Sequence, residues 1–298
     1  MNQPLQPHRP NQLSCEHFDR WRQQQGLRII RLEAERIHRD RSVWRCFDSA
    51  ADEVLYLKVR ERPRPRPSPD RVPEDVLSFY AERLFECADC GVSLEREVPG
   101  LGLDRADAKE RGGACSTAGK GLATFHNLSR FENEPIAPKK ILDKLIGWVE
   151  WIRTRGAPLE RIPSLSELRK SLVERLSHPL THSWIHGDLK PEHVFIREGR
   201  MRFVDRDALK KGFTLLDPAN LVNHMDWLWQ DSDGPVRFFL SVYKRETEEF
   251  DPWMFQFARF HCAIRTIRNR VAANCGGKGE AIEAPLRTLS SIWAKISQ

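Results

Sequence analysis

The fold is decided by residues 184–205, whose sequence is WIHGDLKPEHVFIREGRMRFVD. Two β-prone runs, VFI and MRFV, flank a four-residue turn that contains a glycine, and this pattern is typical of a β-hairpin. A hairpin places its two ends side by side. We therefore predict that His193, at the start of the first strand, lies near Asp205, at the end of the second, and that Asp188 lies in the loop just before them.

The polar side chains of this stretch match the chemical needs of phosphoryl transfer. That reaction uses a carboxylate to orient the attacking hydroxyl and accept its proton, metal ligands near the β- and γ-phosphates, and cations for the developing charge. Asp188 is the candidate base, and Lys190 is a cation two residues away from it. His193 and Asp205 are candidate metal ligands, with Asp207 as a further one. An isolated HGD triplet would indicate only a strand end and an ordinary loop, but these groups accompany it at hairpin spacing.

The composition is that of a folded protein with one large domain or two modest ones. Of its 298 residues, 40% are hydrophobic and 30% are charged. No stretch of eighteen apolar residues occurs, and the polar residues 1–14 lack the apolar core of a secretory signal, so we expect a cytoplasmic protein. The seven cysteines are odd in number and scattered, which favours reduced thiols without a disulfide framework.

The basic charge of the chain is local. The net charge is +6 and the pI about 9.0, and much of the basicity lies in residues 60–71 and 259–270. A solvated loop and a helix flank are the favoured interpretations of such charge runs. We therefore expect no nucleic-acid partner and no membrane span, whereas peripheral association with an anionic surface is compatible with the charge.

The first sixty residues predict a tail followed by a small sheet. Residues 1–20 have the composition of a flexible tail. Three β-rich runs follow, with polar breaks between them, at residues 27–37, 42–47 and 53–60. The simplest joining of three such runs is an antiparallel meander.

The next forty residues predict a loop, a helix and one more strand. The Pro-alternating residues 63–73 cannot continue a strand and predict an extended loop. Pro73 would then begin a helix, because apolar residues recur after it at helical spacing. These residues are Val76, Leu77, Tyr80, Leu84 and Phe85. Residues 93–98 predict a short strand, closed by Pro99 and Gly100.

Beyond residue 100 the chain is mainly helical, so we place a lobe boundary near Pro99 and Gly100. Helix-length apolar recurrence occurs at residues 118–128, 139–153, 165–176, 218–229, 236–243, 252–273 and 282–297. The glycine-rich residues 112–121 lack the spacing of a phosphate-binding loop and the Ser or Thr that must follow its lysine. They predict a mobile loop that enters a helix.

The sequence HGDLKPEH at residues 186–193 resembles the catalytic loop of the aminoglycoside and macrolide phosphotransferase family, which shares the protein kinase fold. The residues FVD at 203–205 are similar to the metal-binding strand end of that family. Further segments resemble parts of the family in the required order, at residues 56–59, 95–100, 121–128 and 216–219. The resemblance implies an α+β, two-lobed, protein kinase-like fold. In it, a small β-rich N-lobe at residues 21–98 binds nucleotide, and a larger, mainly helical C-lobe at residues 99–298 carries the catalytic loop, the metal site and the acceptor site.

The resemblance also implies how the cofactors are held. Lys58 would contact the α- and β-phosphates of ATP and pair with Glu74, while backbone groups of Glu97 and Val98 would meet the adenine. We expect Mg²⁺, or Mn²⁺ because His193 stands where the family usually has asparagine. The implied activity is transfer of the γ-phosphate to a hydroxyl of a small molecule, such as an antibiotic, a sugar or a related metabolite.

Two alternatives stay open. A kinase of a lipopolysaccharide-core or other phosphorylated saccharide is favoured by the C-terminal arginines and by His193, since lipopolysaccharide core kinases look similar at that position. A non-catalytic, ATP-binding pseudokinase or scaffold is favoured by residues 38–41, which contain no glycine to approach a phosphate, and by Leu221, where the family usually has a second aspartate.

The sequence leaves the charge of the acceptor open and argues against a zinc site. Acidic and basic residues compete near the C-terminal tryptophans: a cationic acceptor would suit Asp226, Asp231 and Asp233, and an anionic one would suit Arg259, Arg265, Arg268 and Arg270. The sequence does not choose between them. Cys87 and Cys90 form a CxxC pair, but no second pair has zinc-site spacing, so we predict no structural zinc.

Overall fold

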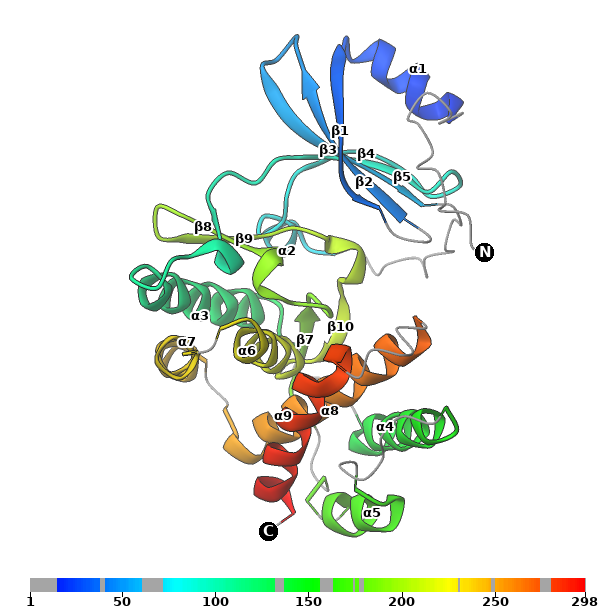
Figure 1. Cartoon of the computed structure of the whole chain (residues 1–298). Coiled ribbons are helices and arrows are strands. Elements are labelled where there is room, and N and C mark those ends of the chain that lie inside the picture. The colour runs from blue at the N-terminus through cyan, green and yellow to red at the C-terminus, as the bar shows by residue number, and fades with distance from the viewer. Residues whose placement is uncertain are drawn as a thin grey trace. The chain divides into compact units, whose positions relative to one another are not determined.

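The computed structural model divides into two compact units, residues 1–99 and residues 100–298 (Figure 1). It describes residues 15–37, 41–60, 72–131, 137–155, 163–173, 175–176, 180–229, 231–247, 250–273 and 280–297. The Arg-Pro run at residues 61–71 and the glycine-free residues 38–40 lie outside these ranges. None of the helices in the described ranges has both the length and the apolar composition that crossing a bilayer requires.

The smaller unit is built on a five-stranded sheet of order β1-β2-β3-β5-β4. Its strands are β1 (Ile29–Ile37), β2 (Arg41–Asp48), β3 (Glu53–Arg60), β4 (Arg83–Cys87) and β5 (Val92–Arg96). Because β2 pairs antiparallel with both β1 and β3, the three β-rich runs form the predicted meander. Alternate residues of β3, Leu55 and Leu57, are buried with Leu94 of β5 and form part of the core of this unit.

Two helices of the smaller unit differ from the sequence-based predictions. Helix α1 (Glu16–Gln24) lies partly in the expected tail, and it is held there because Phe18 is buried with its ring centroid 5.3 Å from that of Phe85. Helix α2 (Glu74–Leu77) has only four residues, and Phe85 belongs to strand β4. The prediction of one long helix was wrong because short apolar runs fit a helical and a strand period equally well.

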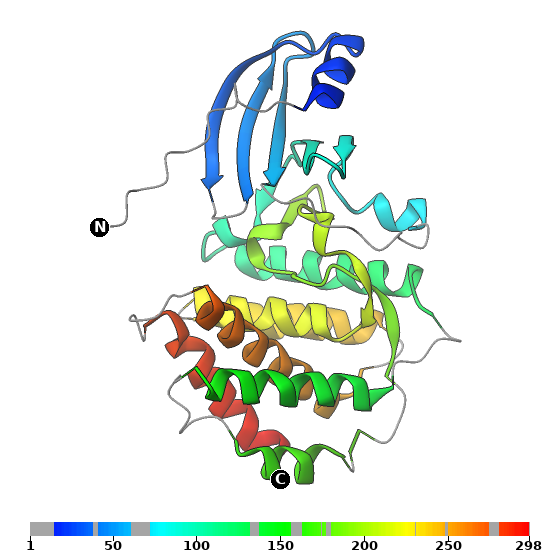
Figure 2. The ribbon, with the colours of Figure 1, turned by 90° about the vertical axis from the view of Figure 1, so that its right-hand side faces the viewer.

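The larger unit is mainly helical, as predicted. Its helices are α3 (Arg111–Leu128), α4 (Pro138–Arg153), α5 (Leu165–Val173), α6 (Leu216–Leu228), α7 (Asp233–Glu246), α8 (Pro252–Ala272) and α9 (Glu280–Ile296). Helix α8 packs against α4, α6 and α9, and Figure 2 shows it running obliquely between α6 and α4. Most of its buried side chains are apolar, which makes α8 the centre of this core.

Short strands and turns of the larger unit position the site. Strand β7 (His182–Ile185) pairs with β10 (Lys210–Phe213), and β8 (Val194–Arg197) pairs with both β9 (Arg200–Phe203) and β6 (Leu101–Gly102). Three 3-10 turns accompany them, η2 (Leu103–Arg105), η4 (Pro191–His193) and η5 (Arg206–Ala208). The pairing of β8 with β9 confirms the predicted hairpin.

The glycine-rich residues 112–121 are helical rather than a mobile loop. They form the first half of α3, which packs closely on α7. A Cβ atom at Gly119 would lie only 2.5 Å from the carbonyl oxygen of Phe239, so a glycine is needed for this close approach. The glycines therefore reflect the packing of two helices and not a phosphate-binding turn.

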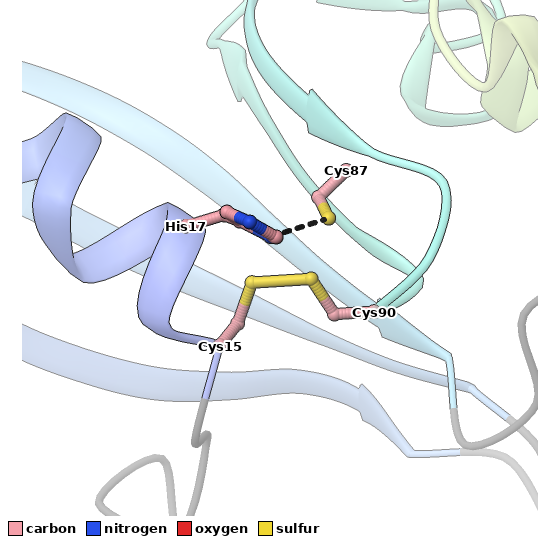
Figure 3. The surroundings of a disulfide bond; sticks show 4 residues. All are labelled: Cys15, His17, Cys87 and Cys90. Atoms are coloured by element: carbon pink, nitrogen blue, oxygen red, sulfur yellow. Dashed lines mark hydrogen bonds between the residues drawn. A yellow bond between two sulfur atoms is a disulfide. The ribbon is translucent and has the colours of Figure 1, made fainter.

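The cysteines also differ from the prediction that all of them are reduced thiols. Cys15, before α1, and Cys90, between β4 and β5, form a disulfide in the structure (Figure 3). Cys46, Cys115 and Cys262 are free and buried.

Candidate active site

The loop after β7 is fixed to helix α6 by hydrogen bonds to its backbone. Asp217 accepts two of them, from the N–H groups of His186 and Gly187 at 2.6 and 2.9 Å. One turn later on the same helix, the Asn220 side chain donates to the Leu189 carbonyl at 2.7 Å. The loop that carries Asp188 is thus held at three backbone positions.

Asp217 is fully buried and stays ionised. Burial alone raises the pKa of this carboxyl, but the hydrogen bond and charge of His126, followed by His186 and the Gly187 N–H, hold the pKa below its ordinary value. Residues 216–219 resemble a segment of the family, but that resemblance gives Asp217 no role. A buried carboxylate paired with loop N–H groups some 30 residues away leaves no local pattern in the sequence.

Gly187 is required by the shape of the loop. Its φ angle is +80°, and an added Cβ atom would lie 2.5 Å from the carbonyl oxygen of Ala208. Its own carbonyl accepts a hydrogen bond from Arg265 of α8 at 2.7 Å. Gly187 therefore turns the chain between the anchored backbone and Asp188.

Asp188 is half-buried and lies between two cations. Its Oδ2 atom is 2.9 Å from the Lys190 ammonium, and its Oδ1 atom is 3.8 Å from the Arg265 guanidinium. Partial burial raises the pKa of Asp188, but the charge and hydrogen bond of Lys190 and then the charge of Arg265 outweigh it, so the pKa is lowered. The carboxylate is therefore ionised at neutral pH and can accept a proton. Lys190 was a predicted site residue, whereas Arg265 was noted only for its charge.

His193 is buried and braces the loop. Its Nδ1 atom donates to the backbone carbonyl of Asp188 at 2.9 Å, and its ring stacks on that of His186 at 5.3 Å between centroids. Burial, followed by the neighbouring His186, lowers the pKa of His193 to about 3. The imidazole is therefore neutral, and since Nδ1 carries the proton, Nε2 has the lone pair that can bind a metal.

The predicted metal residues lie at the two ends of the hairpin. The Val204 N–H donates to the His193 carbonyl at 3.1 Å, and Asp205 follows directly in the left-handed conformation, with φ +61°. Asp207 lies two residues further, in η5. A carboxylate and a neutral imidazole nitrogen fit a divalent cation in their donor chemistry, although Mg²⁺ prefers oxygen ligands alone.

Lys58 of the smaller unit has a different partner from the one predicted. Its ammonium is 2.7 Å from Glu95 of β5, and both side chains are at least nine-tenths buried. Glu95 also accepts from the Arg83 guanidinium at 2.6 Å. Glu74, the predicted partner, is exposed at the start of α2. The prediction failed because α2 ends at Leu77, while neighbouring strands bring Glu95 to the lysine.

The predicted adenine-contacting residues follow strand β5. The Glu97 N–H donates to the Val54 carbonyl at 3.1 Å, so that donor is already used within the sheet. The Glu97 side chain accepts from the Tyr56 hydroxyl at 3.4 Å, and Val98 is buried. The Glu97 N–H is one of the backbone groups predicted to contact the adenine, and it is therefore not available for that contact.

A family model described as "Phosphotransferase enzyme family" matches residues 60–253, about two thirds of the chain. The chain belongs to this family. It is accordingly an ATP-dependent phosphotransferase that acts on a hydroxyl group of a small molecule. No curated protein sequence matches the chain.

Solved structures resemble this phosphotransferase in fold. A thermostable mutant of aminoglycoside phosphotransferase APH(4)-Ia has a TM-score of 0.64 and 11% identity, covering 92% of this chain and 97% of its own. Choline kinase LicA from Streptococcus pneumoniae has a TM-score of 0.61 and 14% identity, with 92% and 99% covered. Amicoumacin kinase hAmiN, in complex with AMP-PNP, Ca²⁺ and Ami, has a TM-score of 0.60 and 11% identity, with 96% and 94% covered. The phosphotransferase therefore has the predicted α+β, protein kinase-like fold.

Proposed function

We propose that this phosphotransferase moves the γ-phosphate of ATP to a hydroxyl of a small anionic acceptor, with Asp188 as the base. The observation that carries the proposal is the ionised Asp188 carboxylate, held between Lys190 and Arg265 on a loop fixed to α6. A carboxylate so placed orients the attacking hydroxyl and accepts its proton. Lys190 stabilises the negative charge that develops during transfer.

The divalent cation would be held by Asp205 and the Nε2 atom of His193, with Asp207 nearby in the chain. When bound, it would neutralise charge on the β- and γ-phosphates. His193 also keeps Asp188 in place through its Nδ1–H bond to the backbone, so it has a role in the loop whichever metal is bound. The imidazole ligand favours Mn²⁺ as a substitute for Mg²⁺.

The smaller unit would bind the nucleotide, as the N-lobe of a kinase does. Lys58 is the phosphate-contacting cation, and the buried Glu95 carboxylate fixes the direction of its ammonium. Backbone groups of residues 97–98, other than the Glu97 N–H, would meet the adenine. Unit 100–298 would then act as the C-lobe that holds the catalytic loop and the acceptor.

The charges near the catalytic loop support an anionic acceptor. Two of the three acidic residues that could attract a cation are paired within the fold: Asp226 with Arg259, and Asp231 with Arg111 at 3.2 Å. Around the catalytic loop, by contrast, cations gather. Beside Lys190 and Arg265, a Cβ atom at Gly187 would lie 3.1 Å from the Lys210 side chain. A phosphorylated saccharide is the acceptor class that this charge pattern favours.

The experiment measures ADP release from ATP, with Mg²⁺ or Mn²⁺, for matched pairs of sugars with and without a phosphate group, and for cationic aminoglycosides. We expect turnover with a phosphorylated sugar, and none in Asp188→Asn. In Lys210→Gln, the KM for that acceptor should rise about tenfold while the KM for ATP stays within about twofold. Turnover of aminoglycosides alone would refute the anionic acceptor. Binding of ATP, measured by thermal shift, without ADP release from any acceptor would favour the non-catalytic alternative.

A further inference from the structure

Four potential metal ligands lie close together in the smaller unit, where the start of α1 meets the turn between β4 and β5 (Figure 3). The Sγ atoms of Cys15, Cys87 and Cys90 all lie within 4.8 Å of one another. The Nδ1 atom of His17 lies 3.8 Å from the Cys87 Sγ atom. Over the described part of the chain, these cysteines form the one group of three or more His, Cys, Asp or Glu donors gathered this closely.

One pair of ligands comes from a tight turn between neighbouring strands. Cys87 is the last residue of β4, and Cys90 lies in the turn that leads into β5. Gly91 closes the turn with a φ angle of +66°, and its carbonyl accepts the Arg60 N–H at 2.9 Å. A Cβ atom at Gly91 would lie 2.9 Å from the Arg60 carbonyl oxygen, so the turn needs a glycine at this point. The CxxCG sequence thus directs two sulfur atoms to the same side of the turn.

The other pair comes from the start of helix α1. Cys15 is the N-cap residue of α1 and is 4% exposed, and His17 lies in the first turn, exposed to solvent. The helix is placed by packing that does not involve sulfur, because Phe18 and Trp21 contact Phe85 of β4 at 5.3 and 5.0 Å between ring centroids. Packing therefore brings the second pair of ligands to the first.

A disulfide accounts for only half of this cluster. The bond between Cys15 and Cys90 does not include Cys87 and His17, which contact each other beside it. A tetrahedral zinc site has Zn–S distances of about 2.3 Å and Zn–N distances of about 2.0–2.1 Å, which place its ligand atoms roughly 3.5–3.8 Å apart. The 3.8 Å between the Cys87 Sγ atom and the His17 Nδ1 atom is close to that spacing, and His17 is exposed at the start of α1.

We propose that, in the reduced protein, Cys15, His17, Cys87 and Cys90 bind one structural Zn²⁺ ion. Three thiolates and one imidazole form a typical closed zinc set, and four protein ligands leave no position for a substrate. On binding, the three thiols release their protons and no atom changes its oxidation state. The ion joins α1 to the β4–β5 turn. Zinc and the disulfide exclude each other, because both use the Cys15 and Cys90 sulfurs.

The spacing of cysteines along the chain does not predict this zinc site. His17 and Cys87 are 70 residues apart, so their pairing is visible only once α1 is packed on β4. A nine-residue helix is too short to be stable in isolation. A metal that fixes its first turn would contribute directly to the stability of this unit.

The test measures zinc content by atomic mass spectrometry in the full-length protein, purified with a phosphine reductant and without added chelator. We expect about one zinc per chain in the wild type and less than about a tenth of that in Cys87→Ser. Asp89→Asn, an exposed change between the two cysteines of the turn, is the matched control and should keep its zinc. Cys87 is the informative position because it is a proposed zinc ligand but is not part of the Cys15–Cys90 disulfide.

Thermal melting provides a second measurement if Cys87→Ser folds poorly. A chelator should lower the melting temperature of the reduced wild type by several degrees and leave that of Cys87→Ser unchanged. Replacing zinc with Co²⁺ should give the absorption bands of tetrahedral thiolate-bound cobalt. The proposal is overturned if the reduced wild type holds no zinc, or if Cys87→Ser holds as much as the wild type.

Discussion

Replacing Asp217 with asparagine tests whether α6 fixes the catalytic loop. The wild-type carboxylate accepts the N–H groups of His186 and Gly187, one on each oxygen. Asparagine keeps the shape but has one oxygen, so one N–H group loses its acceptor and faces an NH₂ group instead. Losing a hydrogen bond to a charged group costs about 1.5–3 kcal/mol, and a buried, unsatisfied N–H costs about 1–3 kcal/mol more. Since the neutral amide is easier to bury than a carboxylate, we expect a net loss of about 2–4 kcal/mol.

The loss is measured by urea denaturation followed through tryptophan fluorescence. Seven of the nine tryptophans lie in residues 100–298, so the signal reports mainly on the unit that contains the loop. The kcat should fall about 10-fold to 100-fold as Asp188 loses its position. The matched control is Asp143→Asn on α4, where an exposed ion pair with Lys139 should change stability by less than about 0.5 kcal/mol. An Asp217→Asn protein as stable and active as the control would refute the anchoring role.

The stability difference between the wild type and Asp217→Asn should depend on pH. Because the folded protein lowers the pKa of Asp217, its carboxylate contributes stability that is present above the unfolded carboxyl pKa of about 3.9 and is lost as the pH falls through the lower, folded value. The stability difference between wild type and Asp217→Asn should therefore be constant from pH 7 to about pH 5, and should narrow below about pH 4. A difference that stays constant into acid would contradict the lowered pKa.

Three further changes test neighbouring features. Asp188→Asn should lower kcat about 100-fold to 10,000-fold and leave the Kd for ATP within a few-fold, measured by ADP release and calorimetry; normal turnover would remove Asp188 as the base. Gly187→Ala should cost at least about 1–3 kcal/mol in urea denaturation, because alanine is strained at positive φ and its Cβ meets a carbonyl oxygen. Glu95→Gln should cost about 3 kcal/mol and raise the KM for ATP, since the buried cations Lys58 and Arg83 lose the negative charge that they share, and Arg83 keeps its ion pair with Glu86. Glu74→Gln is its control, and an equal effect from both would contradict the observed pairing.

The hairpin, and the position of Asp188 in the loop before it, could be predicted because their determinants are local. The alternation of strand residues and the glycine-containing turn lie within 22 consecutive residues, so spacing alone places His193 and Asp205 at adjacent ends. The helices of the larger unit were predicted for the same reason, since apolar recurrence is a property of short windows.

The contacts that support the loop could not be predicted in this way. Asp217 accepts a hydrogen bond from Gly187, which is 30 residues earlier in the sequence. Arg265, which donates to the Gly187 carbonyl, is 78 residues from that glycine in the sequence. Periodicity identifies which face of a helix is apolar, but it does not say which loop a polar residue on that helix will meet. The prediction of a mobile loop from the glycines of α3 was wrong for a related reason. The role of these glycines depends on the close approach of α7, which is more than a hundred residues away in the sequence.

The ion-pair partner of Lys58 could not be identified from the sequence because it depends on a contact between strands. From the sequence, Glu74 is preferred to Glu82 as the partner of Lys58 because it leaves more chain before the segment that resembles the hinge. In the structure, Lys58 lies opposite Ser93, and Glu95 lies two residues further along the same strand, so the two side chains occupy diagonal positions on one face of the sheet. The direction of the lysine is therefore set by the register of β3 against β5 and not by the position of a helix. Because strand register cannot shift by one residue without exchanging the two faces of a strand, Lys58 should keep its direction with or without nucleotide.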